Sequence, residues 1–255
     1  MINAYLTVAL SFVMGLSIFL SMPLVFHKKT GPRHMLLFSA VAIGVLVFLL
    51  MDLYGDVSSI FGSSSPVSAS GYELVFIAGF TLAFLFFMLP KKNRDPEADP
   101  KRTSLLSAVG IGFQNLTEGL VFGSAGAAGL SAIYILSLMG FTLQNVTEGF
   151  PIAAPLMGLK KKPEKGFVAG AFLLGGIPTI IGTVVGLVLY SNLFIVFFDA
   201  LASAAILYVT LVLFHVNISR SRGDGKGKHG IDNRLWLTYC GILIGFILAF
   251  IVNYI

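Results

Sequence analysis

The residues best suited to chemistry form a phrase that occurs twice. It reads Q-N-L-T-E-G at Gln114 to Gly119 and, 30 residues later, Q-N-V-T-E-G at Gln144 to Gly149. Each copy lies within an apolar stretch of the chain. A glutamate in the hydrocarbon part of a membrane costs roughly 2.5 kcal/mol or more unless it faces a partner or a cavity. The two glutamates, Glu118 and Glu148, therefore indicate a functional site.

The spacing within each copy places its oxygen-bearing side chains on one face of a helix. Side chains at positions i, i+3 and i+4 are neighbours on a helix surface, and the glutamate stands at these distances from the asparagine and the glutamine. Amide and carboxylate oxygens are the hard ligands that divalent cations take in proteins. We therefore predict a cation site in mid-membrane. Its predicted ligands are Gln114, Asn115, Glu118, Gln144, Asn145 and Glu148.

Two further roles remain open for the phrase. Polar side chains can join two membrane helices by hydrogen bonds alone, without binding any ligand. Paired carboxylates also occur in intramembrane aspartyl proteases, but the acids here are glutamates and no G-x-G-D motif is present. The phrase supplies no nucleophile, so we expect the protein not to be an enzyme.

Composition places the chain in a membrane. Hydrophobic residues make up 56% of the sequence, charged residues only 11%, and the mean hydropathy is +0.89. These values are typical of a protein with several membrane-spanning helices and exclude a soluble domain of this length. The single cysteine, Cys240, excludes an internal disulfide and a cysteine-based metal cluster.

Apolar runs of about 18 residues or more are long enough to cross a bilayer. The sequence predicts eight such helices, near residues 2–26, 34–54, 72–89, 104–126, 130–157, 166–189, 193–216 and 235–255. The first has no basic residue ahead of it and no A-x-A pattern after it, so we expect a retained span rather than a signal peptide. No connection is long enough for a separate domain, so residues 1–255 are predicted to form one all-α transmembrane domain.

The charges of the connections predict the orientation. All 17 Lys and Arg residues lie in the first, third, fifth and seventh connections, and the even-numbered connections and both termini hold none. Positive residues favour the cytoplasmic side, so we expect both termini outside, in a cell membrane (bacterial inner or plasma membrane). The basic connections are expected to contact anionic lipid headgroups and not nucleic acid.

Additional features complete the expected transport path. Asp52 and Asp199 fall near the outer face within apolar sequence, where an acidic entrance would concentrate cations, although a structural role stays open for both. His215 is a candidate exit residue near the inner face, or an ordinary interfacial histidine.

The small, polar stretch from Gly62 to Gly71 is predicted to be a flexible loop. A short link from Gly123 to Gly129 predicts that the fourth and fifth helices are antiparallel, which makes the repeat inverted.

The doubled phrase resembles the helix 4 and helix 5 motifs of the ZIP family of metal-ion transporters, which read H-N-x-P-E-G and [HQ]-N-x-P-E-G. Weaker similarities are F-L-L-M-D at Phe48 to Asp52 and G-G-I-P-T-I-I-G at Gly175 to Gly182, where the family has G-x-x-E-P-x-x-G. This chain departs from the family at the following positions. Gln114 replaces a histidine, Thr117 and Thr147 replace prolines, and Ile177 replaces a glutamate.

The resemblance implies an eight-helix transporter of divalent metal ions with both termini outside. Zinc, iron or manganese would pass towards the cytoplasm, with helices 1, 4, 5 and 6 moving against helices 2, 3, 7 and 8, within a homodimer. The alternative is a ZIP-fold protein that no longer transports metal and acts as a polar-solute carrier or as a non-transporting binding module.

Overall fold

A computed structural model of the chain describes residues 2–27, 31–89, 99–157, 159, 161–222 and 233–253, and none of these lies in a β-strand. The all-α prediction is therefore confirmed for this part of the chain. The helices are α1 (Ala4–Leu16), the 3₁₀ helix η1 (Ser17–Ser21), α2 (Pro23–Phe26), α3 (Pro32–Ser63), α4 (Pro66–Met88), α5 (Pro100–Ala128), α6 (Ser131–Met157), α7 (Lys165–Gly186), α8 (Asn192–Arg222) and α9 (Asn233–Asn253).

Seven of these helical segments are long and apolar enough to cross a membrane, counting Ala4–Phe26 as one. The remaining long helix, α6, has 27 residues and carries the second copy of the polar phrase. The described part of the chain is thus membrane-embedded. The first predicted helix is divided, because the 3₁₀ helix η1 separates α1 from α2.

The prediction of a flexible loop from Gly62 to Gly71 is wrong. Helix α3 continues to Ser63 and α4 begins at Pro66, so only Ser64 and Ser65 lie between them. Serine hydroxyls support both ends: Ser64 Oγ donates to the Ile60 carbonyl (2.7 Å), and Ser65 Oγ accepts from the Ser68 amide. Ser65 is a favourable N-cap and Pro66 a favourable first residue, so polar sequence here ends one helix and starts the next.

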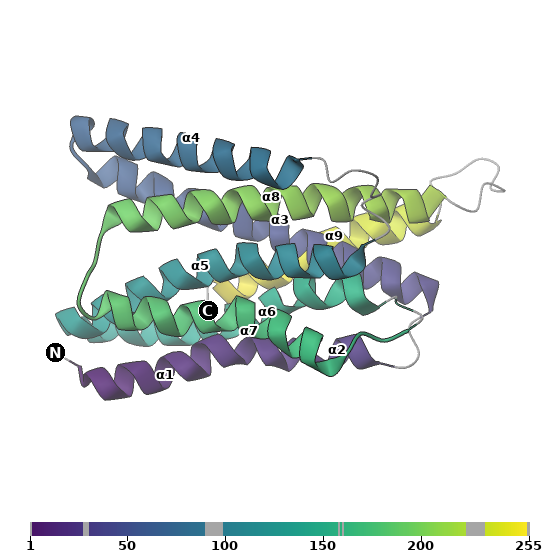
Figure 1. Cartoon of the computed structure of the whole chain (residues 1–255), viewed down its shortest axis with the longest axis horizontal. Coiled ribbons are helices and arrows are strands. Elements are labelled where there is room, and N and C mark those ends of the chain that lie inside the picture. The colour runs from purple at the N-terminus through teal and green to yellow at the C-terminus, as the bar shows by residue number, and fades with distance from the viewer. Residues whose placement is uncertain are drawn as a thin grey trace.

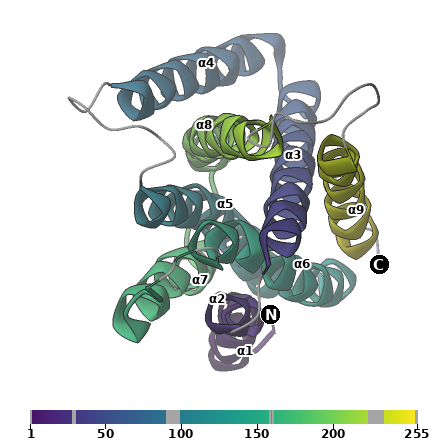
Figure 2. The ribbon, with the colours of Figure 1, turned by 90° about the vertical axis from the view of Figure 1, so that its right-hand side faces the viewer.

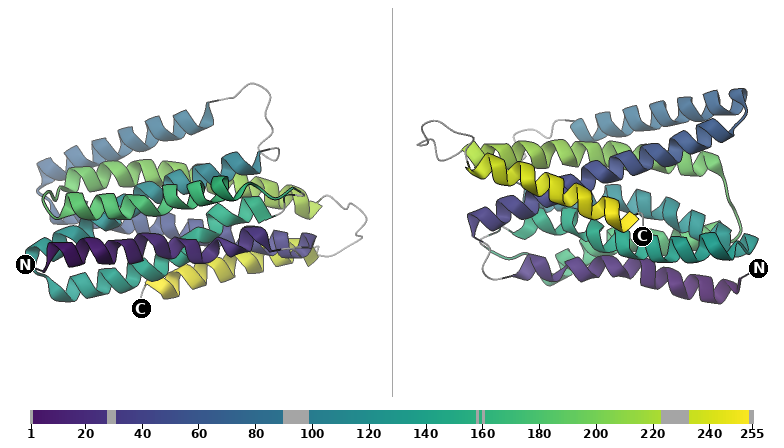
Figure 3. Two further views of the ribbon diagram at one scale, coloured as in Figure 1. Left: turned by 60° about the horizontal axis from the view of Figure 1, so that its bottom comes forward. Right: turned by 180° about the vertical axis from the view of Figure 1, so that it is seen from behind.

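The helices run lengthwise through one bundle (Figure 1). Seen from its end, α5 and α6 lie in the middle, with α7, α1, α3 and α8 around them and α4 outermost against α8 (Figure 2). The views from below and from behind in Figure 3 show the same arrangement. The doubled phrase therefore sits on the two central helices.

The helix ends that flank the four basic connections, such as the end of α4 and the start of α5, lie towards the right-hand end of the bundle in Figure 1, opposite the end where α1 begins. Many of the basic residues in these connections lie outside the described residues. These are Lys28, Lys29, Lys91, Lys92, Arg94, Lys160, Lys226 and Lys228, as well as the side chains of Arg220 and Arg222.

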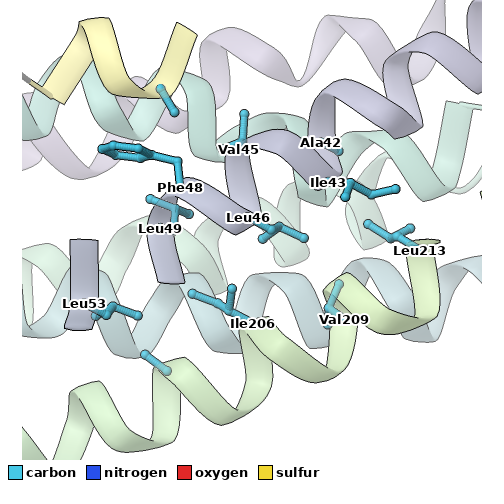
Figure 4. Close-up of a cluster of buried hydrophobic side chains, with 12 residues drawn as sticks. Ala42, Ile43, Val45, Leu46, Phe48, Leu49, Leu53, Ile206, Val209 and Leu213 are labelled. Carbon is cyan, nitrogen blue, oxygen red and sulfur yellow. The ribbon is translucent and has the colours of Figure 1, made fainter. Parts of the chain in front are cut away.

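Helices α3, α8 and α9 are held by large aliphatic side chains. Leu46, Leu49 and Ile206 are fully buried in a cluster that α3 and α8 build together (Figure 4). Phe48 adds an edge-on contact with Phe246 of α9, with 5.8 Å between ring centroids. Within a bilayer, such side chains stabilise helix contacts by van der Waals packing rather than by leaving water, so this side of the bundle is a packed apolar core.

Helices α5 and α7 instead meet backbone to backbone. A Cβ atom added at Gly119 of α5 would meet the Thr179 carbonyl oxygen, and one at Gly182 of α7 would meet the Leu116 carbonyl oxygen. Small residues permit this close approach between membrane helices. Its consequence is that backbone carbonyls of α7 come within reach of polar side chains on α5.

The 3₁₀ segment η1 is tied to α6 beside the second phrase. Ser17 Oγ donates to the Thr142 carbonyl oxygen (2.8 Å), and Ser21 Oγ donates to the Val146 carbonyl oxygen (2.6 Å). Gly149 lies directly against Ser21. A 3₁₀ stretch within a longer helix often marks a functional hinge or strain. Here it brings two serines to the backbone of the helix that carries Glu148.

Candidate cation site

The two copies of the phrase meet through their asparagines. Asn115 Nδ2 of α5 donates to Asn145 Oδ1 of α6 (2.7 Å) and to the Gly175 carbonyl oxygen of α7 (2.9 Å). These bonds join three helices at one point. The structure thereby brings the six predicted ligands, which are Gln114, Asn115, Glu118, Gln144, Asn145 and Glu148, into one buried region.

Every amide nitrogen in this region has an acceptor. Gln114 Nε2 donates to Glu118 Oε1 (3.3 Å), one helical turn along α5. Gln144 Nε2 donates to Asp52 Oδ2 of α3 (3.3 Å), and Asn145 Nδ2 donates to the Phe141 carbonyl oxygen (3.0 Å). An amide whose nitrogen is held in this way directs its oxygen elsewhere. The amide orientations are therefore set by the surrounding protein.

The oxygen atoms, in contrast, are largely without donors. Six buried side-chain oxygens of the two phrases have no hydrogen-bond partner, namely Gln114 Oε1, Asn115 Oδ1, Glu118 Oε2, Gln144 Oε1, Glu148 Oε1 and Glu148 Oε2. Buried polar atoms are nearly always paired, and an unpaired one costs about 1–3 kcal/mol. Asn145 differs from the other five residues because its oxygen accepts from Asn115.

The two glutamates are close enough to interact electrostatically, and Asp52 interacts with both. No Lys, Arg or His occurs between Thr103 and Leu159, so the stretches of α5 and α6 around the two phrases carry no positive charge to balance the glutamates. Like charges repel more strongly in a low-dielectric interior than in water. A bound cation would relieve this repulsion and would give the unpaired oxygens a partner.

The threonines that precede the glutamates donate to the backbone and not to the unpaired oxygens. Thr117 Oγ1 donates to the Gln114 carbonyl oxygen (2.7 Å), and Thr147 Oγ1 donates to the Gln144 carbonyl oxygen (2.8 Å). Both bonds close on the residue three positions earlier in the same helix. These hydroxyl hydrogens are thus occupied by the backbone and do not serve the unpaired oxygens.

The two predicted entrance acids differ in their surroundings. Asp52 is half-buried, and both of its oxygens accept hydrogen bonds, from Gln144 and from Asn253 Nδ2 of α9 (2.8 Å). Asp199 of α8 is only 1% exposed, lies near Thr117, and has two oxygens without a hydrogen-bond partner. The structure thus places Asp52 against the six-residue group and Asp199 on the α8 side of α5.

His215 lies on α8 with an exposed side chain, apart from the six-residue group. Across the described ranges, no three His, Cys, Asp or Glu side chains gather as they would around a metal ion. A cation site built on the doubled phrase would therefore combine the two glutamates with amide oxygens.

Sequence reasoning missed Asn253. A single asparagine at the end of the last helix has no neighbour in the sequence that would mark it, and its importance appears only through its bond to Asp52. Comparison with known proteins adds no further assignment, because no protein-family model and no curated protein matches the chain.

Proposed function

We propose that this chain is a membrane transporter that carries a divalent metal ion, zinc, iron or manganese, through a site formed by α5 and α6. The observation that carries the proposal is the group of six buried oxygen atoms without donors. They come from five residues on two helices, they include two carboxylates, and the amides among them are held with their nitrogens turned to other acceptors. This is the donor set that a hard or borderline divalent cation takes.

A purely structural role accounts for the two asparagines but not for the two glutamates. The Asn115 to Asn145 bond joins α5 to α6, as polar side chains between membrane helices do. The glutamates form no such bridge: neither Glu148 oxygen has a hydrogen-bond partner, although the amides of Asn115 and Gln144 lie close to it, and Glu118 accepts only from its own helix. Two buried carboxylates that form no hydrogen bond between helices favour ligand binding over a role in helix packing.

The direction and architecture of transport follow from the sequence features as parts of the same proposal. The basic connections favour an orientation with both termini outside, in which Asp52 and Asp199 would face the outer half and His215 the inner half of the path. The protein would belong with ZIP-like transporters in a cell membrane, with the phrase as an inverted repeat. The block of α1, α5, α6 and α7 would then move against α3, α4, α8 and α9, within a homodimer.

Uptake by proteoliposomes tests this function. Purified protein should carry Zn²⁺, Fe²⁺ or Mn²⁺ into vesicles along a concentration gradient. Glu118→Gln and Glu148→Gln should each reduce the flux on the order of 100-fold, the upper end of what the loss of an outer-shell partner costs. Both substitutions keep the size of the side chain, so the protein should still fold.

Glu73→Gln is the matched control, because Glu73 is exposed on the outermost helix α4. It should leave the flux unchanged. Wild-type flux in both phrase variants would rule out the site. Binding of the ion by the wild type without any flux would favour the non-transporting binding module instead.

A further inference from the structure

Gln144 contributes to the proposed site only when its amide points the right way. The terminal torsion of a glutamine is broad, and rotation by half a turn exchanges the oxygen with the nitrogen. An amide nitrogen carries two hydrogens and cannot bind a cation. A flipped Gln144 would therefore replace a ligand with a repelling group. Something in the structure must hold the amide with its oxygen towards the site.

Asp52 holds it. Gln144 Nε2 lies 3.3 Å from Asp52 Oδ2, and an ionised carboxylate can only accept a hydrogen bond. The flipped amide would set two oxygens against each other at this distance. With the nitrogen engaged, Gln144 Oε1 is the atom that lies buried without a partner.

Asp52 is in turn held by Asn253. Asn253 Nδ2 donates to the second carboxylate oxygen, Asp52 Oδ1, at 2.8 Å. The contact joins the last helix, α9, to α3, and α3 to the second phrase on α6 through Gln144. Asp52 thus accepts hydrogen bonds from side chains on two other helices, and its bond to the Gln144 nitrogen leaves the Gln144 oxygen for the site.

The first copy of the phrase is oriented differently. Asn115 is fixed by the Gly175 carbonyl oxygen, which belongs to the backbone of α7, and Gln114 is fixed by Glu118 of its own helix. Gln144 relies on a side chain from another helix, which itself needs a partner. The orientation of the second copy is therefore the one that a substitution outside both phrases can disturb.

We propose that Asn253 is a positioning residue of the cation site, acting through Asp52 to keep the Gln144 oxygen directed at the ion. This inference rests on the proposed function, because it assumes a cation between α5 and α6. Residues that orient metal ligands typically contribute 10- to 100-fold to metal affinity, although they do not touch the metal.

The test is calorimetric binding of Mn²⁺ to the purified full-length protein. Asn253→Leu removes the donor at nearly constant size and should weaken Mn²⁺ binding about tenfold. Asp52→Asn should weaken it in the same direction, because an amide at this position can meet either end of Gln144. Asn192→Leu, at the start of α8, is the matched control and should bind as the wild type does.

A double-mutant cycle separates positioning from a general structural effect. If Asn253 acts through Gln144, then Asn253→Leu combined with Gln144→Ala should bind Mn²⁺ no more weakly than Gln144→Ala alone. Unchanged affinity in Asn253→Leu, or losses that add in the double variant, would overturn the inference while leaving the cation site in place. A wild type that binds none of the proposed ions would instead remove the proposed function, and the inference with it.

Discussion

Two buried polar groups in this bundle use similar residues in opposite ways. At the end of the bundle where α3 and α9 begin, Asn217 Nδ2 of α8 donates to the Leu36 carbonyl oxygen (3.1 Å), and Asn217 Oδ1 accepts from Thr238 Oγ1 of α9 (2.9 Å). At the centre, Asn115 also donates from its nitrogen to two acceptors, but its oxygen lies buried without a partner.

The difference separates a structural polar group from the group that we propose to bind a ligand. At Asn217 both ends of the amide are used and three helices are joined, so every buried atom contributes to stability. In the doubled phrase the nitrogens are used and most oxygens are not. Unpaired buried acceptors lower the stability of the folded state. Proteins tolerate such a cost where a site needs it.

The largest expected effect on stability is at the structural group. Asn217→Leu removes hydrogen bonds to α3 and α9 and leaves Thr238 to its own helix carbonyl. It should lower the free energy of unfolding by about 1–3 kcal/mol. Thermal unfolding in detergent measures this. The affinity for Mn²⁺ should stay at the wild-type value in the same preparation, and a tenfold change in it would erase the distinction between the two groups.

A smaller effect of opposite sign is expected in the doubled phrase. Glu148→Gln replaces two unpaired oxygens with an amide that has hydrogens for its neighbours, among them Gln144, whose side chain is close to Glu148. The cation-free variant should therefore be more stable than the cation-free wild type, by about 1 kcal/mol. The measurement is thermal unfolding in the presence of a chelator. A clear loss of stability in this variant would mean that Glu148 supports the fold.

The sequence was sufficient to predict that the polar residues of the two phrases face each other, but not how their side chains are oriented. The repeated spacing of glutamine, asparagine and glutamate predicted one polar face on each helix, and Asn115 and Asn145 do meet. The amide orientations depend on Gly175 and Asp52, which approach from other helices, and no local pattern reports that approach. Asn253 was unpredictable for the same reason.

The ends of the helices, like the amide orientations, could not be predicted from the local sequence pattern alone. Apolar length located the membrane-spanning segments, because burial in lipid demands it. The stretch from Gly62 to Gly71 has few apolar side chains, yet it forms the end of α3 and the start of α4. Its serine hydroxyls bond to helix carbonyls, as Ser63 Oγ does to the Ser59 carbonyl oxygen (2.8 Å). A helix extends wherever its backbone groups are satisfied, and hydropathy does not record that condition.

The central claim is that the unpaired oxygens of the two phrases hold a cation. Anomalous scattering from crystals grown with Mn²⁺ tests it directly, because the signal locates the ion without reference to function. We predict a peak between α5 and α6, within about 2.5 Å of carboxylate oxygens of Glu118 and Glu148, the outer end of the range for oxygen ligands of hard cations. The peak should be absent in Glu148→Gln. A wild-type crystal at saturating Mn²⁺ with no peak between these helices would contradict the account.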